Sequence, residues 1–188
     1  MRRYAFPLVG FMVFVGLMLF RGQASTLEPT TFIDVSSQVG INFSNQVPSS
    51  CLLPFSTGSA WADYDSDGDV DLYLTNQGGN NSLYRNDGDT NSDGLPDFTD
   101  VASAAGVTIP NGVSIAAVFI DYDNDNDNDL YVTNWDDDGP GAAFVGNILY
   151  QNRLTETGSA TFLDVTSSAG TGLDDGGVGN RSAWGDFD

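Results

Sequence analysis

Residue types that serve as general bases, phosphate ligands or cross-links are scarce or missing in this sequence. The 188 residues contain no Lys and no His, and the six basic residues are all Arg, against 26 acidic residues. Nucleic acid and anionic membrane surfaces are therefore poor partners, because both are bound through Lys and Arg. The single cysteine, Cys51, excludes an intrachain disulfide. In an exported chain something other than disulfides must then hold the loops.

The acidity is concentrated after residue 24. That part of the chain carries all 26 acids and three arginines, which gives it a net charge of −23. Apolar residues make up 40% of the sequence and aromatic residues 12%, too many for a disordered acidic segment. A divalent cation is the natural counter-charge, and Ca²⁺ is the cofactor that we expect.

The N-terminal residues 1–24 have the pattern of an export signal. Two arginines precede the 16-residue apolar run Ala5 to Phe20, and the small residues Gly22 and Ala24 follow with the spacing found before cleavage points. An uncleaved anchor is the alternative, although the run is shorter than the roughly 20 residues that span a bilayer. Both alternatives place residues 25–188 outside the cytoplasm, in a secreted, periplasmic or cell-surface location.

Three sequence motifs recur in the same order along the rest of the chain. Phe-x-Asp-Val starts at Phe32, Phe98 and Phe162, with spacings of 66 and 64 residues. Leu-Tyr-x-Asn starts at Leu83 and Leu149, which are 66 residues apart. An aromatic residue that leads into spaced aspartates occurs at Trp61, Phe119 and Trp184, with spacings of 58 and 65 residues. A period of about 60 residues indicates a repeat architecture.

Each repeat is predicted to consist of short strands. Residues 70–75 and 130–133 are rich in β-forming residues, and residues 114–120 form a continuous apolar run that is typical of a buried inner strand. The small-residue segments 102–106 and 167–170 are predicted to be turns, with one helical turn at most. No long helical periodicity follows residue 25, so the predicted fold class is all-β.

A repeat of this length with several short strands suits one blade of a β-propeller, in which about four to eight blades close a ring. Trp61, Phe119 and Trp184 are then expected to pack in the cores of the blades. Residues 25–188 amount to fewer than three repeats, and the sequence stops inside the third acidic motif, at Asp188. We therefore expect a fragment truncated at its C-terminus; a short, complete β-protein with an open sheet edge is the alternative.

Aspartates alternate along two nine-residue segments, 63–71 and 121–129. Alternate carboxylates on a tight loop can converge on calcium, which takes six to eight oxygens at about 2.3–2.6 Å. Position 6 is Gly68 in the first segment and Asn126 in the second, and both residues tolerate the left-handed backbone of such a turn. The predicted metal ligands are Asp63, Asp65, Asp67, Asp69, Asp71, Asp121, Asp123, Asp125, Asp127 and Asp129, with Asp186 and Asp188 in the third motif.

These loops are not EF-hands, because Leu74 and Val132 stand where an EF-hand has its bidentate Glu. A weaker candidate lies in the segment 87–97, which looks like an insertion between two repeated motifs. Its spaced oxygen donors are Asp89, Asn91, Asp93 and Asp97. The segment is either a further calcium loop or a polar hairpin tip.

The combined pattern resembles the FG-GAP/VCBS repeat, in which Asp-x-Asp-x-Asp-Gly-x-x-Asp follows an aromatic strand and precedes Leu-Tyr-x-Thr-Asn and Leu-Tyr-x-Asn. Residues 58–76 and 114–134 carry this pattern, and 180–188 carry its beginning. The form of residues 162–170 is similar to that of the ASPIC/UnbV, or cartilage acidic protein, relatives. The resemblance implies a seven-bladed propeller like the integrin alpha-chain head, with calcium in loops at the blade edges. It also implies that the backbone carbonyls of Asp69 and Asp127 complete the sites.

Two classes of function remain open. The first is a non-catalytic, extracellular calcium-binding scaffold for protein or glycan interaction or adhesion, with membrane contact only through the N-terminal segment if that is uncleaved. The second is the propeller portion of a secreted polysaccharide-active enzyme whose catalytic residues lie beyond this sequence. A glycosidase needs two acids held apart across a cleft. The clustered acids here are accounted for by the loops, and no catalytic motif is present.

Overall fold

The computed structural model describes residues 31–47, 57–110, 112–135 and 145–170. The chain divides into two compact units, Met1–Ile33 and Asp34–Asp188, and the strands described below belong to the second. The predicted export signal, Cys51, Trp184 and the third acidic motif with Asp186 and Asp188 lie outside the described residues. Within the described part, no helix has the length and apolar character needed to cross a membrane.

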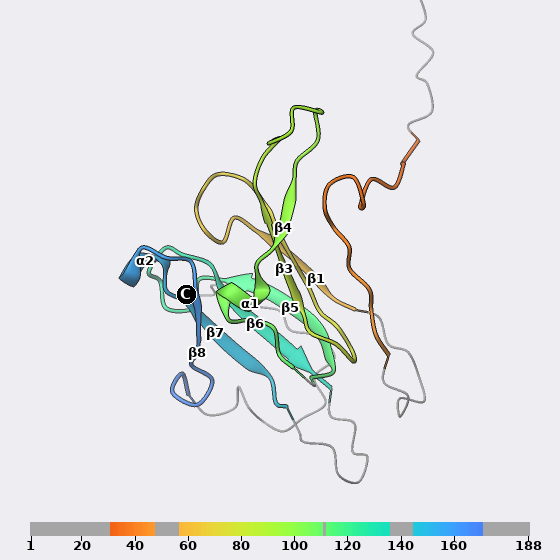
Figure 1. Ribbon diagram of the computed structural model, residues 1–188. Helices are drawn as coiled ribbons and strands as arrows, with labels where there is room; N and C mark the ends of the chain where they lie inside the picture. Colours follow the sequence, from red (N-terminus) through yellow and green to blue (C-terminus); the bar gives the residue numbers. More distant parts are fainter. Residues whose placement is uncertain (1–30, 48–56, 111, 136–144, 171–188) are drawn as a thin grey trace, which may run out of the picture. The chain divides into compact units, whose positions relative to one another are not determined.

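The described residues form two four-stranded antiparallel sheets, and the strands of each sheet are neighbours in chain order (Figure 1). The first sheet consists of β1 (Ser59–Ala62), β2 (Asp71–Leu74), β3 (Ser82–Asn86) and β4 (Phe98–Asp100). The second sheet consists of β5 (Ser114–Ile120), β6 (Asp129–Asn134), β7 (Ile148–Asn152) and β8 (Phe162–Asp164). The prediction of an all-β chain built from repeats is confirmed.

The repeated motifs occupy the same positions in both sheets. The two Leu-Tyr-x-Asn motifs lie in β3 and β7, and the second and third Phe-x-Asp-Val motifs lie in β4 and β8. The register is also repeated, because Leu72 pairs with Tyr84 in the first sheet and Leu130 pairs with Tyr150 in the second. The inner strand β6 is buried along its whole length, and its apolar side chains divide between two clusters, Leu130 and Val132 in one and Tyr131 in the other.

Two single-turn helices connect the strands. Helix α1 (Ala102–Ala105) follows β4, in the small-residue segment that was predicted to form at most one helical turn. It ends at Gly106, whose left-handed backbone (φ +86°) lets its N–H donate to the Ala102 carbonyl oxygen. Helix α2 (Leu154–Thr157) lies between β7 and β8, where the first sheet instead has the 87–97 hairpin between β3 and β4.

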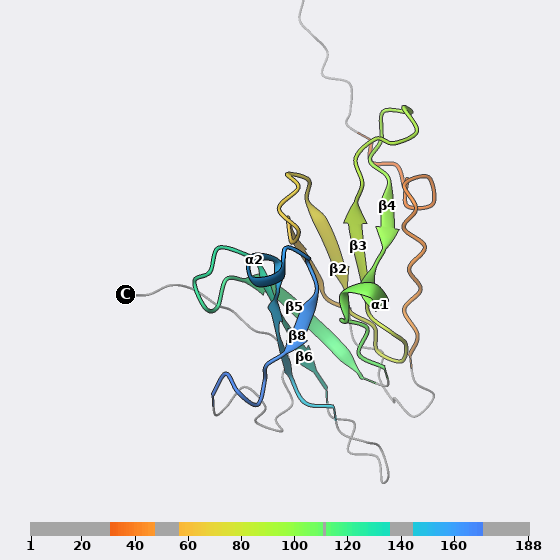
Figure 2. The ribbon, with the colours of Figure 1, turned by 60° about the vertical axis from the view of Figure 1, so that its left-hand side comes forward.

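An apolar cluster with members from both sheets packs them together. Figure 2 shows the strands of the two sheets from a second direction. The cluster's buried members larger than alanine are Tyr64, Tyr73, Leu83, Val107, Ile109, Leu130, Val132 and Tyr150. The Tyr73 ring meets Phe119 edge-on with the ring centroids 6.5 Å apart, and its hydroxyl donates to the Val107 carbonyl at 2.8 Å. Burial of each large apolar side chain stabilises the fold by about 1.5–3 kcal/mol, so this cluster holds the two sheets together.

The prediction that Trp61 packs in the core is wrong for the described residues, because its side chain is 55% exposed. Trp61 lies on the edge strand β1. Its counterpart in the second sheet, Phe119, is partly buried because Tyr73 of the first sheet lies against it. No described strand covers Trp61 in the same way. The neighbouring sheet, and not the residue type, therefore decides whether this aromatic position is buried.

The first copy of the Phe-x-Asp-Val motif, at Phe32, is not in a strand, unlike the copies in β4 and β8. Each of those strands pairs with a preceding strand that carries Leu-Tyr-x-Asn. No such segment precedes Phe32 in the sequence. Among the described residues, the first copy therefore has no preceding strand of this kind to pair with.

Candidate metal centres

Two aspartate loops connect the first and second strands of the two sheets. Residues 63–70 link β1 to β2, and residues 121–128 link β5 to β6. In both loops the first aspartate organises the turn: Asp63 accepts the N–H groups of Asp67 and Gly68 at 3.1 and 3.0 Å, and Asp121 accepts the equivalent pair at 3.1 Å each. The two segments therefore have the same hydrogen-bonded turn although they differ in sequence.

The sixth position of each loop has the predicted left-handed backbone. The φ angle is +98° at Gly68 and +72° at Asn126. Position 4 is also left-handed in both loops, with φ +58° at Ser66 and +61° at Asn124. Asn tolerates this conformation better than other non-glycine residues, so the second loop keeps the turn without a glycine.

The last aspartate of each loop is fully buried and holds two strands together. Asp71 is 0% exposed, and its carboxylate accepts the N–H groups of Tyr64 at 3.0 Å and Asn86 at 2.8 Å. Asp129 is also 0% exposed and accepts the equivalent bonds in the second sheet at 2.9 and 2.8 Å. These bonds tie the start of each loop to the end of the third strand, which fixes where the other carboxylates lie.

Three carboxylates converge at the start of each loop. One oxygen from each member lies within 4.8 Å of an oxygen from the other two, in the groups Asp63, Asp65 and Asp71 and Asp121, Asp123 and Asp129. Two oxygens bound to one calcium ion lie at most about 5 Å apart, so both groups have the spacing that one ion requires. In the first group, Asp65 Oδ1 is buried and has no hydrogen-bond partner. The donor set and this unpaired oxygen both fit a hard divalent cation.

Burial raises the pKa of the carboxylates in these groups. The pKa of Asp71 is raised to about 6 and that of Asp129 to about 7, chiefly because burial penalises the charged form. Burial also raises the pKa of Asp65, with a further contribution from the nearby Asp67 carboxylate. A bound cation would stabilise the charged forms and offset these shifts.

The shifts predict an unusual pH dependence for the calcium-free chain. Folded Asp129 and Asp71, with pKa values of about 7 and about 6, bind protons more tightly than the unfolded chain, whose Asp pKa is about 3.9. The free energy of unfolding should therefore be greatest near pH 4 and fall as the pH rises through 7. Thermal unfolding between pH 4.5 and 8 in calcium-free buffer measures this.

With calcium present the trend should reverse, because protons then compete with the ion for the same oxygens. Asp34→Asn serves as a control, because Asp34 is exposed and bonds only to Ser36 among the described contacts. That variant should keep both trends. A calcium-free unfolding curve that is flat or rises between pH 4.5 and 7 would contradict the assignment of buried protonated aspartates.

The structure divides the predicted ligands of the second loop into two groups. Asp121, Asp123 and Asp129 form one, whereas Asp125 and Asp127 lie with Glu156 in another. Asp67 accepts the N–H of Asp69 at 2.9 Å and Asp125 accepts that of Asp127 at 3.1 Å, but the Asp69 side chain is exposed whereas Asp127 is buried. Sequence reasoning missed Glu156, because a lone glutamate after a Leu-Tyr-x-Asn motif carries no signal.

The 89–97 segment forms the same turn as the two aspartate loops. Asp89 accepts the N–H groups of Asp93 and Gly94 at 3.0 and 2.9 Å, and Gly94 is left-handed with φ +87°. Asn91 takes the place of the third-position aspartate, and its amide donates to Asp97 Oδ1 at 3.0 Å. The segment is therefore a hairpin tip that also has the backbone conformation of the two aspartate loops. A polar hairpin tip and a calcium loop, the two predicted alternatives, are thus compatible with the same geometry.

Hydrogen bonds between the sheets place the two aspartate loops side by side. The Asn128 amide donates to the Asp63 carbonyl at 2.8 Å, and the Asn152 amide donates to the Tyr64 carbonyl at 2.8 Å. Asn152 also donates to the Asn128 carbonyl at 3.1 Å. The recurrence of Asn at the end of Leu-Tyr-x-Asn could have pointed to Asn152, whereas Asn128 has no counterpart in the first loop, where Val70 stands.

Two successive antiparallel sheets, each with the same aspartate loop between its first two strands, define a repeat protein of the β-propeller-like class. The sequence model of the FG-GAP-like repeat matches residues 63–132, from the first aspartate loop into β6. Residues 63–132 thus carry an FG-GAP-like repeat, as the resemblance implied, and the match does not bear on the finer likeness to ASPIC/UnbV relatives. A search among curated proteins found no match to the chain.

Proposed function

We propose that the chain is a calcium-binding β-propeller scaffold that acts outside the cytoplasm, without catalysis, and offers a rigid surface to a protein or glycan. One observation carries the calcium assignment. Two equivalent loops on consecutive sheets each bring three aspartate oxygens within 4.8 Å of one another. Carboxylates so close repel one another unless a cation or proton lies between them, and calcium is the cation that prefers such oxygens.

The proposed side-chain ligands follow the predicted pattern. In the first loop they are Asp63, Asp65, Asp67 and Asp71, with the carbonyl of Asp69. In the second loop they are Asp121, Asp123 and Asp129, with the carbonyl of Asp127, because the Asp125 carboxylate lies in the separate group with Glu156. Extracellular calcium is near millimolar, so sites with dissociation constants of about 10⁻⁴–10⁻³ M are largely filled there. The N-terminal export pattern supports a location where this calcium is available.

We extend the proposal to the 89–97 hairpin, because its turn matches that of the two aspartate loops. Asp89, Asp93 and Asp97 supply carboxylates, and Asn91 supplies an amide oxygen. An amide in place of a carboxylate lowers the ligand charge, and ligand charge sets affinity in calcium loops. The hairpin should therefore fill at a higher calcium concentration than the loops of the two sheets.

Calcium in these loops would stiffen the junction between the sheets. The carbonyls of Asp63 and Tyr64 accept bonds from Asn128 and Asn152 of the second sheet. An ion that orders the first loop therefore also orders the groups through which the second sheet is attached. A rigid junction of this kind suits a binding surface, because little entropy is lost when a partner docks on it.

Calcium binding by single-ligand variants tests the proposal. Asp65→Asn and Asp123→Asn each remove the negative charge of one proposed ligand from one loop and leave the buried aspartates in place. Each variant should weaken one class of calcium site by about tenfold or more, and the double variant should weaken two. Titration of the calcium-stripped chain by calorimetry measures this. Asp34→Asn is the charge-matched control, and equal binding by all variants would contradict the assignment.

A further inference from the structure

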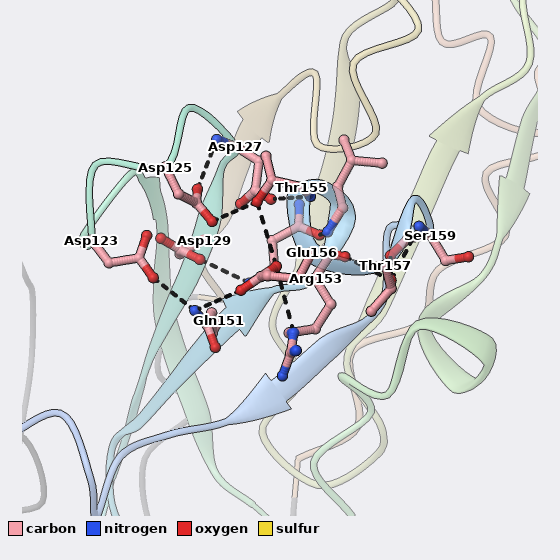
Figure 3. A network of polar contacts seen from close by, with 12 residues as sticks. Asp123, Asp125, Asp127, Asp129, Gln151, Arg153, Thr155, Glu156, Thr157 and Ser159 are labelled. Atoms are coloured by element: carbon pink, nitrogen blue, oxygen red, sulfur yellow. Dashed lines mark hydrogen bonds and ion pairs between the residues drawn. The ribbon is translucent and has the colours of Figure 1, made fainter.

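We propose that the second sheet holds a second divalent cation, bound by Asp125, Asp127 and Glu156, beside the ion of the repeated loop. This inference deepens the proposed function, because it assumes that the repeated loops bind calcium. The three carboxylates each offer an oxygen within 4.8 Å of an oxygen of the other two. Asp125 and Asp127 belong to the β5–β6 loop, whereas Glu156 comes from α2 (Figure 3).

An unpaired buried oxygen in this group points to a ligand. Asp127 is only 3% exposed, and its Oδ1 is buried without a hydrogen-bond partner. The other oxygen, Oδ2, accepts the Thr155 N–H at 3.0 Å. Buried carboxylates are normally paired or coordinate a metal, because an unsatisfied buried charge is costly. A cation among the three carboxylates would supply the missing partner of Oδ1.

The neighbouring polar groups hold the carboxylates in place but balance only part of their charge. The Thr155 hydroxyl donates to Asp125 Oδ2 at 2.7 Å, which joins α2 to the loop. Arg153 Nε lies 3.5 Å from Glu156 Oε2. One guanidinium, itself partly exposed, balances one of the three negative charges. Two charges are left, which is the charge of one divalent cation.

The group is separate from the three carboxylates at the start of the loop. Gln151 lies between the two groups, and its amide donates to Asp123 Oδ2 at 2.7 Å and to Glu156 Oε1 at 3.1 Å (Figure 3). A single amide thus orients one carboxylate of each group. Two ions bound in this way would share the Gln151 bridge without sharing either of these carboxylates.

The first sheet lacks this arrangement, so it does not follow from the repeat motif. Asp69, the counterpart of Asp127, is exposed. Arg85 stands in the position of Gln151 and pairs with Asp87 at 2.7 Å. The 87–97 hairpin replaces α2, and with it Glu156. The second cation is therefore proposed for the second sheet alone.

The ligand chemistry indicates the type of ion. All three side chains are carboxylates, which are hard oxygen donors and suit calcium. They come from two short segments, and Glu156 is exposed, so water can occupy the remaining coordination positions. The probe in the test is therefore Ca²⁺ itself.

Glu156→Gln tests the site in the full chain. Because Glu156 is exposed, the variant should fold normally, and its unfolding temperature in chelator should equal that of the wild type. Calcium titration should show one bound equivalent fewer than the wild type, or one class of site weakened by about tenfold or more. Asp34→Asn, which removes the same charge from an exposed position, should bind as the wild type does.

Two failures can be told apart. Wild-type chain that binds calcium while Glu156→Gln binds the same number of ions with the same affinity overturns the second site and leaves the proposed function intact. Wild-type chain that binds no calcium at all overturns the proposed function together with the second site. An equal loss of calcium binding in Glu156→Gln and Asp34→Asn would show a general effect of net charge, and it would also overturn the second site.

Discussion

Removing calcium with excess chelator will lower the midpoint of thermal unfolding of this chain by about 10–20 °C. Each site that is filled at about 100 times its dissociation constant stabilises the folded state by about 2.7 kcal/mol. Each of the two sheets that the structure describes has one such aspartate loop, and each kcal/mol corresponds to about 2–4 °C for a chain of this size. The unfolding midpoint should fall further if the 89–97 hairpin and the group with Glu156 also bind calcium.

Calorimetry or circular dichroism in matched buffers measures the shift. Restoring calcium should restore the midpoint, whereas the same concentration of magnesium should restore less of it. Magnesium demands near-octahedral geometry and gives up its waters reluctantly, which does not suit a loop with several carboxylates. An unfolding curve that is the same with chelator and with calcium would contradict the metal assignment and leave the acidity of the loops without a cause.

Asp129→Ala should lower the free energy of unfolding by about 2–4 kcal/mol even without calcium. The carboxylate of Asp129 accepts the N–H groups of Tyr122 and Asn152, and all of it is buried. Truncation leaves these two donors without their partner, at a cost of about 1–3 kcal/mol for each buried group. Relief of the desolvated carboxylate offsets part of this cost. Chemical denaturation in chelator measures the difference.

Asp123→Ala is the matched comparison, because it removes a ligand of the same group that is exposed. Its carboxylate accepts one described hydrogen bond, from the Gln151 amide. In chelator this variant should differ from the wild type by no more than about 0.5 kcal/mol, whereas in calcium both variants should bind the ion more weakly. Equal stability losses in chelator for the two variants would show that Asp129 has no separate structural role.

The aspartates of one loop thus differ in burial because they have different roles. The buried ninth-position residues, Asp71 and Asp129, hold the backbone of the loop against the third strand and also face the metal group. The exposed third-position residue Asp123 is held by a side-chain amide alone among the described contacts. In the proposed site, calcium would lie between a rigid side, which the sheet holds in place, and an exposed side that can adjust to the ion.

Local pattern was enough to predict much of the fold. The alternation of Val, Leu and Tyr around residues 70–75 and 130–133 and the apolar run at 114–120 predicted strands that became β2, β6 and β5. The left-handed backbone at Asn126 was also predicted, because it depends on the tolerance of one residue type for one conformation. Strands and turn conformations of this kind depend on residues a few positions apart in the sequence, so the sequence alone can predict them.

The recurrence of the motifs predicted that strands and loops come in equivalent sets, and so that two aspartate loops share one conformation. The recurrence did not predict whether the side chain at a given position of the repeat is buried. Trp61 and Phe119 occupy the same place in the repeat, yet among the described ring contacts Phe119 has a tyrosine ring against it and Trp61 has none. Burial depends on the sheet that packs alongside, which no local pattern describes.

What the sequence determined by itself is therefore the all-β repeat, the two aspartate turns and the residue types that suit calcium. Only the tertiary structure decided how the carboxylates are grouped: it separated Asp125 and Asp127 from the other aspartates of their loop and brought Glu156 to them. It also joined Asn152 to Tyr64, 88 positions away in the chain. The physical reason is that metal groups and inter-sheet bonds depend on distances in space between segments far apart in sequence, whereas strands and turns depend on adjacent residues.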